Sequence, residues 1–439
     1  MKINLDMDTE NAAIIRDLLS IWDVEYSNPD VSIVSIVFDT IKSENSRKKI
    51  IIPSSSPNFF RWSKRQNLNT VSEPGKQISV NATPNLDLYF TPKIMFNYNK
   101  PTNEITSDAI LMNVDVINEY RQTLQCTLAA KSSLKYRIFT SVPIPYNLAP
   151  KRLRASVMRQ KNLPKNFNIC NFLPIDALRL LLAKSIEDIS KQKLVRKTWK
   201  NRKSAIMLTH DVETRTGLLK TPKIKKLEEK YNLPSAWFIP SHNYALDKNV
   251  VTTLANNGEV GSHDTKHDGK LFHLSENALG KRLLSSKERL ETISDKPVIG
   301  FRAPLLQHSR SILKHLKSCG YLYDSSIPTW EAMHPRTMCP HGIGTVFPIT
   351  IEGLQEIPIT IMQDHQFLHV MKYTPKETIA EWLSEVSVIK ELGGSCVFLS
   401  HPEYSILDEP DLSLYEEFLS VIASDNDLSS TLPKEIIKQ

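Results

Sequence analysis

From residue 204 onward the chain alternates short apolar segments with longer helical patterns, and this alternation limits the folds open to it. Strands that alternate with helices lie parallel, because each helix carries the chain back to the start of the next strand. We expect strands at 205–208, 236–239, 259–261, 298–301, 346–349 and 396–399, and helices at 218–231, 278–293, 311–319 and 377–392. The sequence therefore predicts an α/β fold, either a closed barrel or an open doubly wound sheet, with its site at the carboxyl ends of the strands.

The part of the chain before residue 204 has a different residue content. All twelve histidines lie at or after His210. The earlier part holds a helical pattern at 12–21 and β-rich runs at 31–38, 49–52, 86–90 and 109–116, which predict a smaller α/β domain. At 439 residues the chain is long enough for two cores. We therefore expect an N-terminal α/β accessory domain at 1–150, a basic helical connector at 151–203 and a (β/α) domain at 204–439.

Charge and cysteine usage exclude several classes of protein. The net charge of +7 is mild for this length, so no nucleic-acid partner is expected. The basic run from Lys191 to Lys203 either contacts an anion at the periphery, such as a lipid headgroup, or is a solvated face. The five cysteines form no CxxC pair, which argues against a disulfide framework and against a thiolate zinc site.

No segment of the sequence has the pattern of a secretory signal or of a transmembrane helix. The first thirty residues are acidic, and no apolar stretch reaches the ~20 residues that a membrane span needs. We therefore expect a cytoplasmic protein. The sequence gives no indication of the oligomeric state.

Ionisable residues follow several of the expected strands. Asp211 and Glu213 are two apart, so an extended backbone places both carboxylates on one side, where they either serve a cation and a proton or cap the next helix. His263 and His267 have the i, i+4 spacing that converges on one cation if the segment is helical. Two imidazoles and a carboxylate are the ligands of catalytic zinc sites that keep a position open for water.

Two further strand ends carry a cationic or titratable side chain. Arg302 follows an apolar strand, where an unpaired cation would be costly, so it either bonds a carboxylate such as Asp211 or lies at the surface. His401 follows the strand at 396–399 and precedes Pro402. It is either an acid placed across the pocket or a hydrogen-bonded core histidine.

In this order, the clusters resemble the motif series of the NodB-type polysaccharide deacetylases, carbohydrate esterase family 4, over about residues 204–402. The resemblance implies a distorted (β/α) barrel that holds a divalent metal, with zinc expected and cobalt or another transition metal as alternatives. It assigns the metal ligands to Glu213, His263 and His267, the base to Asp211, the RxP motif to Arg302 and Pro304, and the acid to His401. The family's fourth motif has no clear match, and we favour Asp324 over Asp364 for its role.

The activity that the resemblance implies is the metal-dependent removal of an N-acetyl group from an N-acetylated sugar or glycan. Asp211 would take a proton from water, a backbone N–H near Pro304 would help to stabilise the oxyanion, and His401 would protonate the departing amine.

The sequence also departs from the family pattern at several positions. Glu213 replaces the usual Asp ligand, Asp264 and Asp268 stand where Ser and Pro are common, and Leu305 stands where an aromatic residue is common. These departures leave two alternatives open, a catalytically inactive glycan-binding barrel and an amidase that acts on a non-sugar amide. A non-haem iron oxygenase is disfavoured, because neither ligand histidine begins a His-x-Asp or His-x-Glu pair.

Overall fold

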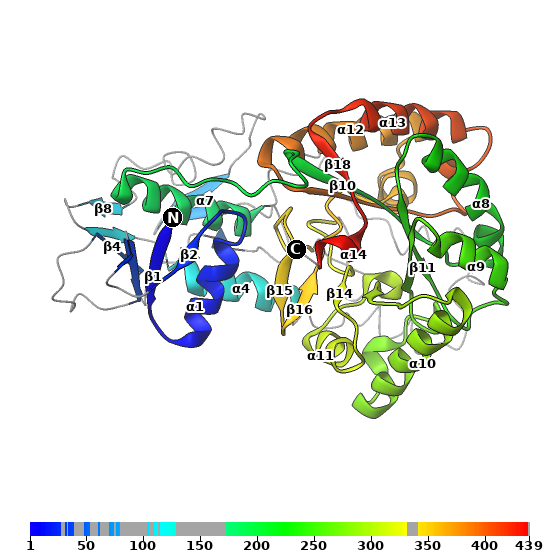
Figure 1. The fold of residues 1–439 in the computed structure, drawn as a ribbon, viewed down its shortest axis with the longest axis horizontal. Helices are drawn as coiled ribbons and strands as arrows, with labels where there is room; N and C mark the ends of the chain where they lie inside the picture. The colour runs from blue at the N-terminus through cyan, green and yellow to red at the C-terminus, as the bar shows by residue number, and fades with distance from the viewer. Residues whose placement is uncertain are drawn as a thin grey trace. The chain divides into compact units, whose positions relative to one another are not determined.

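In the computed structural model the described residues group into two compact units (Figure 1). The structure describes residues 1–27, 31–32, 34–38, 48–52, 60–61, 70–73, 76–79, 103–105, 109–112, 115–128, 173–331 and 341–437. The first unit takes its described residues from 1–127, 168–197 and 343–345, and the second takes most of its own from 198–342 and 346–439. The strand expected at 86–90 and the 151–172 part of the expected connector lie outside the described residues.

The first unit is built on a six-stranded sheet in the order β2-β1-β3-β4-β9-β8. Its strands are β1 (Lys2–Asp6), β2 (Glu25–Tyr26), β3 (Val34–Phe38), β4 (Lys49–Ile52), β8 (Asn103–Ile105) and β9 (Ala109–Met112). All neighbours pair in parallel except β8 and β9. A separate antiparallel sheet joins β5 (Phe60–Arg61), β6 (Thr70–Glu73) and β7 (Lys76–Ser79). A smaller α/β domain before the barrel is confirmed.

The described part of this unit includes the helices α1 (Thr9–Leu18), α4 (Val116–Leu128) and α7 (Pro174–Ser190). The Asp8 side chain caps α1 by accepting from the Asn11 backbone N–H, which satisfies a donor that the helix itself cannot use. α7 lies in the range expected for the connector and contacts β3, β4 and β9.

The second unit alternates strands with helices. Its strands are β10 (Ser204–Asp211), β11 (Ser235–Ile239), β12 (Glu259–Ser262), β13 (Gly300–Phe301), β14 (Tyr323–Asp324), β15 (Ile349–Ile351), β16 (Leu354–Glu356), β17 (Ser395–Ser400) and β18 (Leu428–Ser430). Its main helices are α8 (Arg215–Lys230), α9 (Lys248–Ala255), α10 (Glu276–Ser294), α11 (Arg310–Ser318), α12 (Pro375–Leu392) and α13 (Leu412–Ser424), which lie around the sheet in Figure 1. Among these described strands, every pair is parallel except β15 with β16.

The sheet runs β15-β16-β14-β13-β12-β11-β10-β17, and the segment after β16 joins its two sides. The Ile357 backbone N–H donates to the Asp324 carbonyl oxygen at 2.9 Å, and the N–H groups of Thr360 and Ile361 donate to that of Val397 in β17 at 3.2 and 3.1 Å. An apolar cluster that includes Met207, Phe238 and Val397 is buried in the same unit. The expected distorted (β/α) barrel is confirmed.

One expected strand was misplaced. The sequence predicted a strand at 346–349, whereas the structure has β15 at Ile349–Ile351, paired antiparallel with β16. Glu352 and Gly353 between them have φ of 52° and 73°, the left-handed backbone of a two-residue hairpin turn. A hairpin reverses the chain within two residues, so this pair departs from the strand–helix rhythm.

Candidate metal centre and active site

The polar residues that follow the parallel strands gather at one edge of the barrel. Asp211 is the last residue of β10, and His263, Arg302 and His401 directly follow β12, β13 and β17. The carboxyl ends of parallel strands point the same way, so side chains from distant parts of the sequence meet there.

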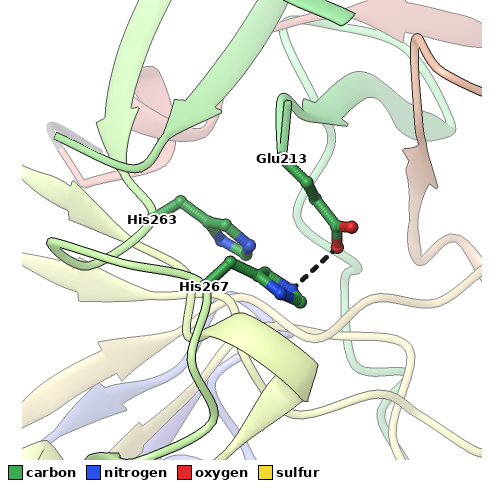
Figure 2. A group of neighbouring side chains, drawn as sticks. All are labelled: Glu213, His263 and His267. Atoms are coloured by element: carbon green, nitrogen blue, oxygen red, sulfur yellow. Dashed lines mark ion pairs between the residues drawn. The ribbon is translucent and has the colours of Figure 1, made fainter. Parts of the chain in front are cut away.

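Three of these side chains form a group that can hold a metal ion. Ligand atoms of Glu213, His263 and His267 all lie within 4.8 Å of one another, and Figure 2 shows the side chains converging from two loops. Glu213 Oε1 lies 2.9 Å from His267 Nε2, and the two imidazole rings are stacked with centroids 5.5 Å apart. His263 is 1% exposed, whereas His267 and Glu213 are 12% and 26% exposed, so the group opens to one side.

The hydrogen bonds of His263 leave one ring nitrogen available for a cation. Its Nδ1 lies 2.9 Å from the carbonyl oxygen of Arg302, which can only accept, so Nδ1 carries the proton. Its Nε2 then presents a lone pair. Among the residues that the structure describes, the buried Nε2 atom of His263 has no hydrogen-bond partner, and that of His267 faces the Glu213 carboxylate at 2.9 Å. Two such nitrogens beside a carboxylate fit a divalent cation that keeps a position open.

The protonation of the three side chains follows from their surroundings. Burial lowers the pKa of His263 to about 4, so this ring is neutral. Burial would raise the pKa of Glu213, but His267 and His401 together hold it well below its usual range. Burial would lower the pKa of His267, but the Glu213 carboxylate raises it.

The backbone between the two histidines differs from the helical segment on which the sequence argument relied. Residues 263–269 form no helix, and Asp264 has a left-handed φ of 65°. The Ser241 and His242 backbone N–H groups donate to the carbonyl oxygens of Asp264 and Thr265 at 2.9 and 2.8 Å. The i, i+4 spacing thus brings the rings together through an irregular loop fixed by its neighbours.

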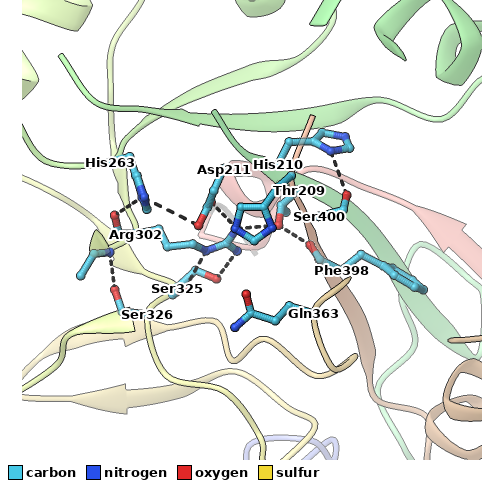
Figure 3. A network of polar contacts seen from close by, with 12 residues as sticks. Thr209, His210, Asp211, His263, Arg302, Ser325, Ser326, Gln363, Phe398 and Ser400 are labelled. Carbon is cyan, nitrogen blue, oxygen red and sulfur yellow. Dashed lines mark hydrogen bonds and ion pairs between the residues drawn. The ribbon is translucent and has the colours of Figure 1, made fainter. Parts of the chain in front are cut away.

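Arg302 is fully buried and joined to the end of β10 by a polar network (Figure 3). One terminal nitrogen donates to Asp211 Oδ1 at 3.1 Å and to Thr209 Oγ1 at 2.7 Å. Nε and the other terminal nitrogen donate to the carbonyl oxygen and the hydroxyl of Ser325, each at 2.8 Å. The guanidinium carbon also lies 4.2 Å from the centre of the Phe238 ring. Asp211 is therefore held beside a fixed cation.

A second charged pair lies across the site. Nδ1 of His401 is 2.6 Å from Asp364 Oδ1, and the His401 backbone N–H donates to Asp364 Oδ2 at 2.7 Å. Burial would lower the pKa of His401, but Asp364 and, further away, Glu213 raise it to about 10. His401 Nε2, the ring nitrogen that does not contact Asp364, lies 3.6 Å from Glu213 Oε1. It therefore faces the group of Glu213, His263 and His267.

The two aspartates considered for the fourth motif have different places. Asp364, which the sequence ranked second, contacts His401, whereas Asp324 accepts from the Ser326 hydroxyl at 2.6 Å. That hydroxyl in turn accepts from the Ala303 backbone N–H at 2.8 Å, directly before Pro304. Asp324 thus braces the loop that begins the RxP turn, and burial raises its pKa to about 6. Asp364 and not Asp324 is therefore the aspartate that contacts His401, and the assignment of the fourth motif stays a prediction.

Two residues show what sequence reasoning missed and what it could have found. Asp364 follows no expected strand, and its contact with His401 bridges 37 positions, so the sequence named it only as a second candidate and did not indicate this contact. His210 lies between Thr209 and Asp211 but faces the other side of β10, where it contacts Glu228 at 2.8 Å and stacks on Trp237. Strand alternation is the signal that separates this core histidine from the site.

Residues 199–323 match the family described as polysaccharide deacetylase. A peptidoglycan deacetylase from Helicobacter pylori is 29% identical over 112 residues, which cover 25% of this chain and 38% of that protein. The chain thus spans less than two fifths of this relative. Among solved structures, a Mycobacterium smegmatis protein assigned to the polysaccharide deacetylases is 20% identical, with a TM-score of 0.47 over 55% of this chain and 92% of that one.

A family 4 acetyl xylan esterase from Clostridium thermocellum, solved with a cobalt ion, is 12% identical, with a TM-score of 0.36 over 53% of this chain and 90% of that one. The family match covers the strands that carry Asp211, Glu213, His263, His267 and Arg302, and it ends before Asp364 and His401. Residues 199–323 of this chain therefore belong to a polysaccharide deacetylase domain of the CE4/NodB type.

Proposed function

We propose that the second unit is a metal-dependent hydrolase that removes the N-acetyl group from an N-acetylated sugar or glycan. The observation that carries the proposal is the group of Glu213, His263 and His267, flanked by the buried Asp211 and His401. This group lies beside a carboxylate that can accept a proton and an imidazole that can donate one. This arrangement suits hydrolysis of an amide, which needs an activated water and a protonated leaving amine.

Each protein group has a separate part in the proposed reaction. Asp211 accepts a proton from the attacking water, and Arg302 keeps this carboxylate oriented through its ion pair at 3.1 Å. His401 donates a proton from Nε2 to the departing amine, because its Nδ1 is committed to Asp364. A backbone N–H at the turn after Pro304, where Leu305 has a φ of 56°, faces the developing oxyanion. The divalent cation, for which we propose zinc, would supply Lewis-acid chemistry when bound.

The substrate class rests on the family, and two alternatives follow from the departures at Glu213 and Leu305. The first is a catalytically inactive barrel that binds glycan, and the second is an amidase that acts on a non-sugar amide. Glycan binding alone requires neither a proton acceptor nor a proton donor, so it does not account for the buried Asp364–His401 and Arg302–Asp211 pairs. Burying charges costs free energy, so both pairs favour an active enzyme.

The basic run from Lys191 to Lys203 was considered for contact with an anion. Several of its charges are engaged inside their own units. Lys193 pairs with Glu187, Lys200 with Glu435 and Lys203 with Glu391. Anion binding by this run stays a prediction.

Among the described residues, no helix has both the length and the apolar character needed to cross a membrane.

The experiment that tests the proposal is acetate release by the purified full chain from a panel of N-acetylated sugars, oligosaccharides and non-sugar acetamides. Each reaction is run after metal removal and again with added zinc or cobalt. We expect metal-dependent acetate release from at least one sugar, and its loss in Asp211→Asn, which keeps the shape of the side chain and removes the base. Release from the non-sugar amides alone would favour the amidase. Glycan binding without release would favour the inactive barrel.

A further inference from the structure

The loop that carries both metal-ligand histidines is held by one arginine from a different element. Arg282 lies in α10, and its guanidinium contacts Asp264 and Asp268, the residues that directly follow His263 and His267. These are two of the positions at which the sequence departs from the family pattern. The departures therefore share one partner in the folded chain.

The guanidinium of Arg282 makes a two-pronged, bidentate contact, or fork, with each of the two carboxylates. Nε and one terminal nitrogen of Arg282 donate to the two carboxylate oxygens of Asp264 at 2.8 and 2.6 Å. The terminal nitrogens also donate to the two oxygens of Asp268 at 2.8 and 3.1 Å, and one of them donates to the Lys266 carbonyl oxygen at 3.0 Å. The planar guanidinium presents its donors at fixed angles, so it fixes the two aspartates relative to each other.

The protein interior limits the freedom of this arrangement. The side chain of Asp264 is 1% exposed and that of Arg282 is 14% exposed, so water screens the pair weakly. The Asp264 carbonyl oxygen also accepts from the Ser286 hydroxyl, one helical turn after Arg282. The loop has no helical hydrogen bonds of its own at 263–269, so its conformation depends on these outside contacts.

We propose that Arg282 is a positioning residue for the metal centre: by clamping Asp264 and Asp268, it sets the separation of His263 and His267 that a divalent cation requires. The inference rests on the proposed metal centre. Outer contacts that orient ligands contribute to metal affinity, and their loss weakens it by about 10–100-fold.

The sign of the effect separates positioning from plain electrostatics. Arg282 is a cation near a site for another cation, so its charge alone repels the metal. If charge were its main effect, Arg282→Met would bind metal more tightly. If Arg282 positions the ligands, the same substitution binds metal more weakly, because the two imidazoles no longer converge.

The test is a Co²⁺ titration of the metal-free full chain, followed by the visible absorption of the bound ion, which reports both affinity and coordination geometry. We expect Arg282→Met to lower Co²⁺ affinity by about 10–100-fold and to change the spectrum. Arg282→Lys keeps the charge but loses the fork, so we expect it to weaken binding as well. Arg289→Met, an exposed arginine of the same helix, is the matched control and should bind as the unaltered chain does.

Thermal unfolding of each metal-free variant separates a loss of fold from a loss of geometry. If Arg282→Met unfolds, Arg282→Lys decides the question. Unchanged or tighter Co²⁺ binding by a folded Arg282 variant would overturn the inference and leave the metal centre standing. Failure of the unaltered chain to bind Co²⁺ would overturn the metal centre itself, and the inference with it.

Discussion

The two ends of the barrel in the second unit bury carboxylates in opposite surroundings. At the carboxyl ends of the strands, Asp211 pairs with Arg302, and Glu213 lies beside histidines that hold its pKa below the usual range although burial would raise it. At the other end, Glu259 begins β12 and accepts from the Tyr323 hydroxyl at 2.7 Å and from the Lys434 backbone N–H at 2.9 Å. Burial raises the pKa of Glu259 to about 7.

The difference shows which buried acid is available for chemistry. Cationic side chains keep a carboxylate ionised and able to bind a metal or accept a proton, whereas neutral donors satisfy its oxygens without keeping it charged. A buried acid is therefore informative through its partners, and burial alone does not mark a site. The predictions below test this contrast between the two ends.

The largest effect is expected for His263→Ala, which removes the ligand whose Nε2 is free for a cation. Both metal binding and acetate release should be lost, because the two remaining ligands no longer surround the ion. Co²⁺ titration and the acetate assay measure the two effects. His315→Ala is a suitable control, since this histidine lies in α11 and contacts the Ser311 carbonyl oxygen of its own helix. Full activity of His263→Ala in a metal-free preparation would remove the basis of the hydrolase proposal.

An intermediate effect is expected for Asp364→Asn. An amide has the same shape, but it carries no charge and can present an N–H to Nδ1 of His401, which disfavours the proton-donating form of the ring. We expect kcat to fall by about 10²-fold, the lower end of the range for general acid catalysis, with Co²⁺ affinity unchanged. Asp408→Asn, at a partly exposed aspartate paired with Lys220, should leave both quantities as they are. A kcat within twofold of the unaltered chain would argue against His401 as the acid.

The smallest effect on activity is expected for Glu259→Gln, at the far end of the barrel. In the unaltered chain, the folded-state pKa of Glu259 is about 7 and exceeds the ordinary value of 4.5, so ionisation of Glu259 favours the unfolded chain. The free energy of unfolding of the unaltered protein should therefore fall as the pH rises from about 4.5 to about 7, by at most about 3 kcal/mol from this group.

Glu259→Gln has no such ionisation, so its stability should change less over that pH range. Denaturant unfolding at a series of pH values measures the difference, and Co²⁺ affinity should stay unchanged. An equally steep pH dependence in the variant would show that folding does not raise the pKa of Glu259.

Most of the residues at the candidate site could be predicted from the sequence, because they directly follow strands. The alternation of strands and helices in the sequence predicted a parallel sheet. The ends of its strands carry Asp211, His263, Arg302 and His401. The hairpin of β15 and β16 could not be placed in the same way, because a two-residue turn does not follow that alternation. The domain boundaries at 150 and 203, the cytoplasmic location and the roles assigned to the site residues stay predictions.

The sequence by itself determined which side chains are offered at the mouth of the barrel, because strand direction and residue order fix which positions end there. Tertiary structure decided which partners complete them. Asp364 reaches His401 from the segment before α12, and Arg282 reaches the histidine loop from α10. These contacts depend on how separate elements pack. The residues become neighbours only when the barrel has formed, so the spacing of residues along the chain does not predict them.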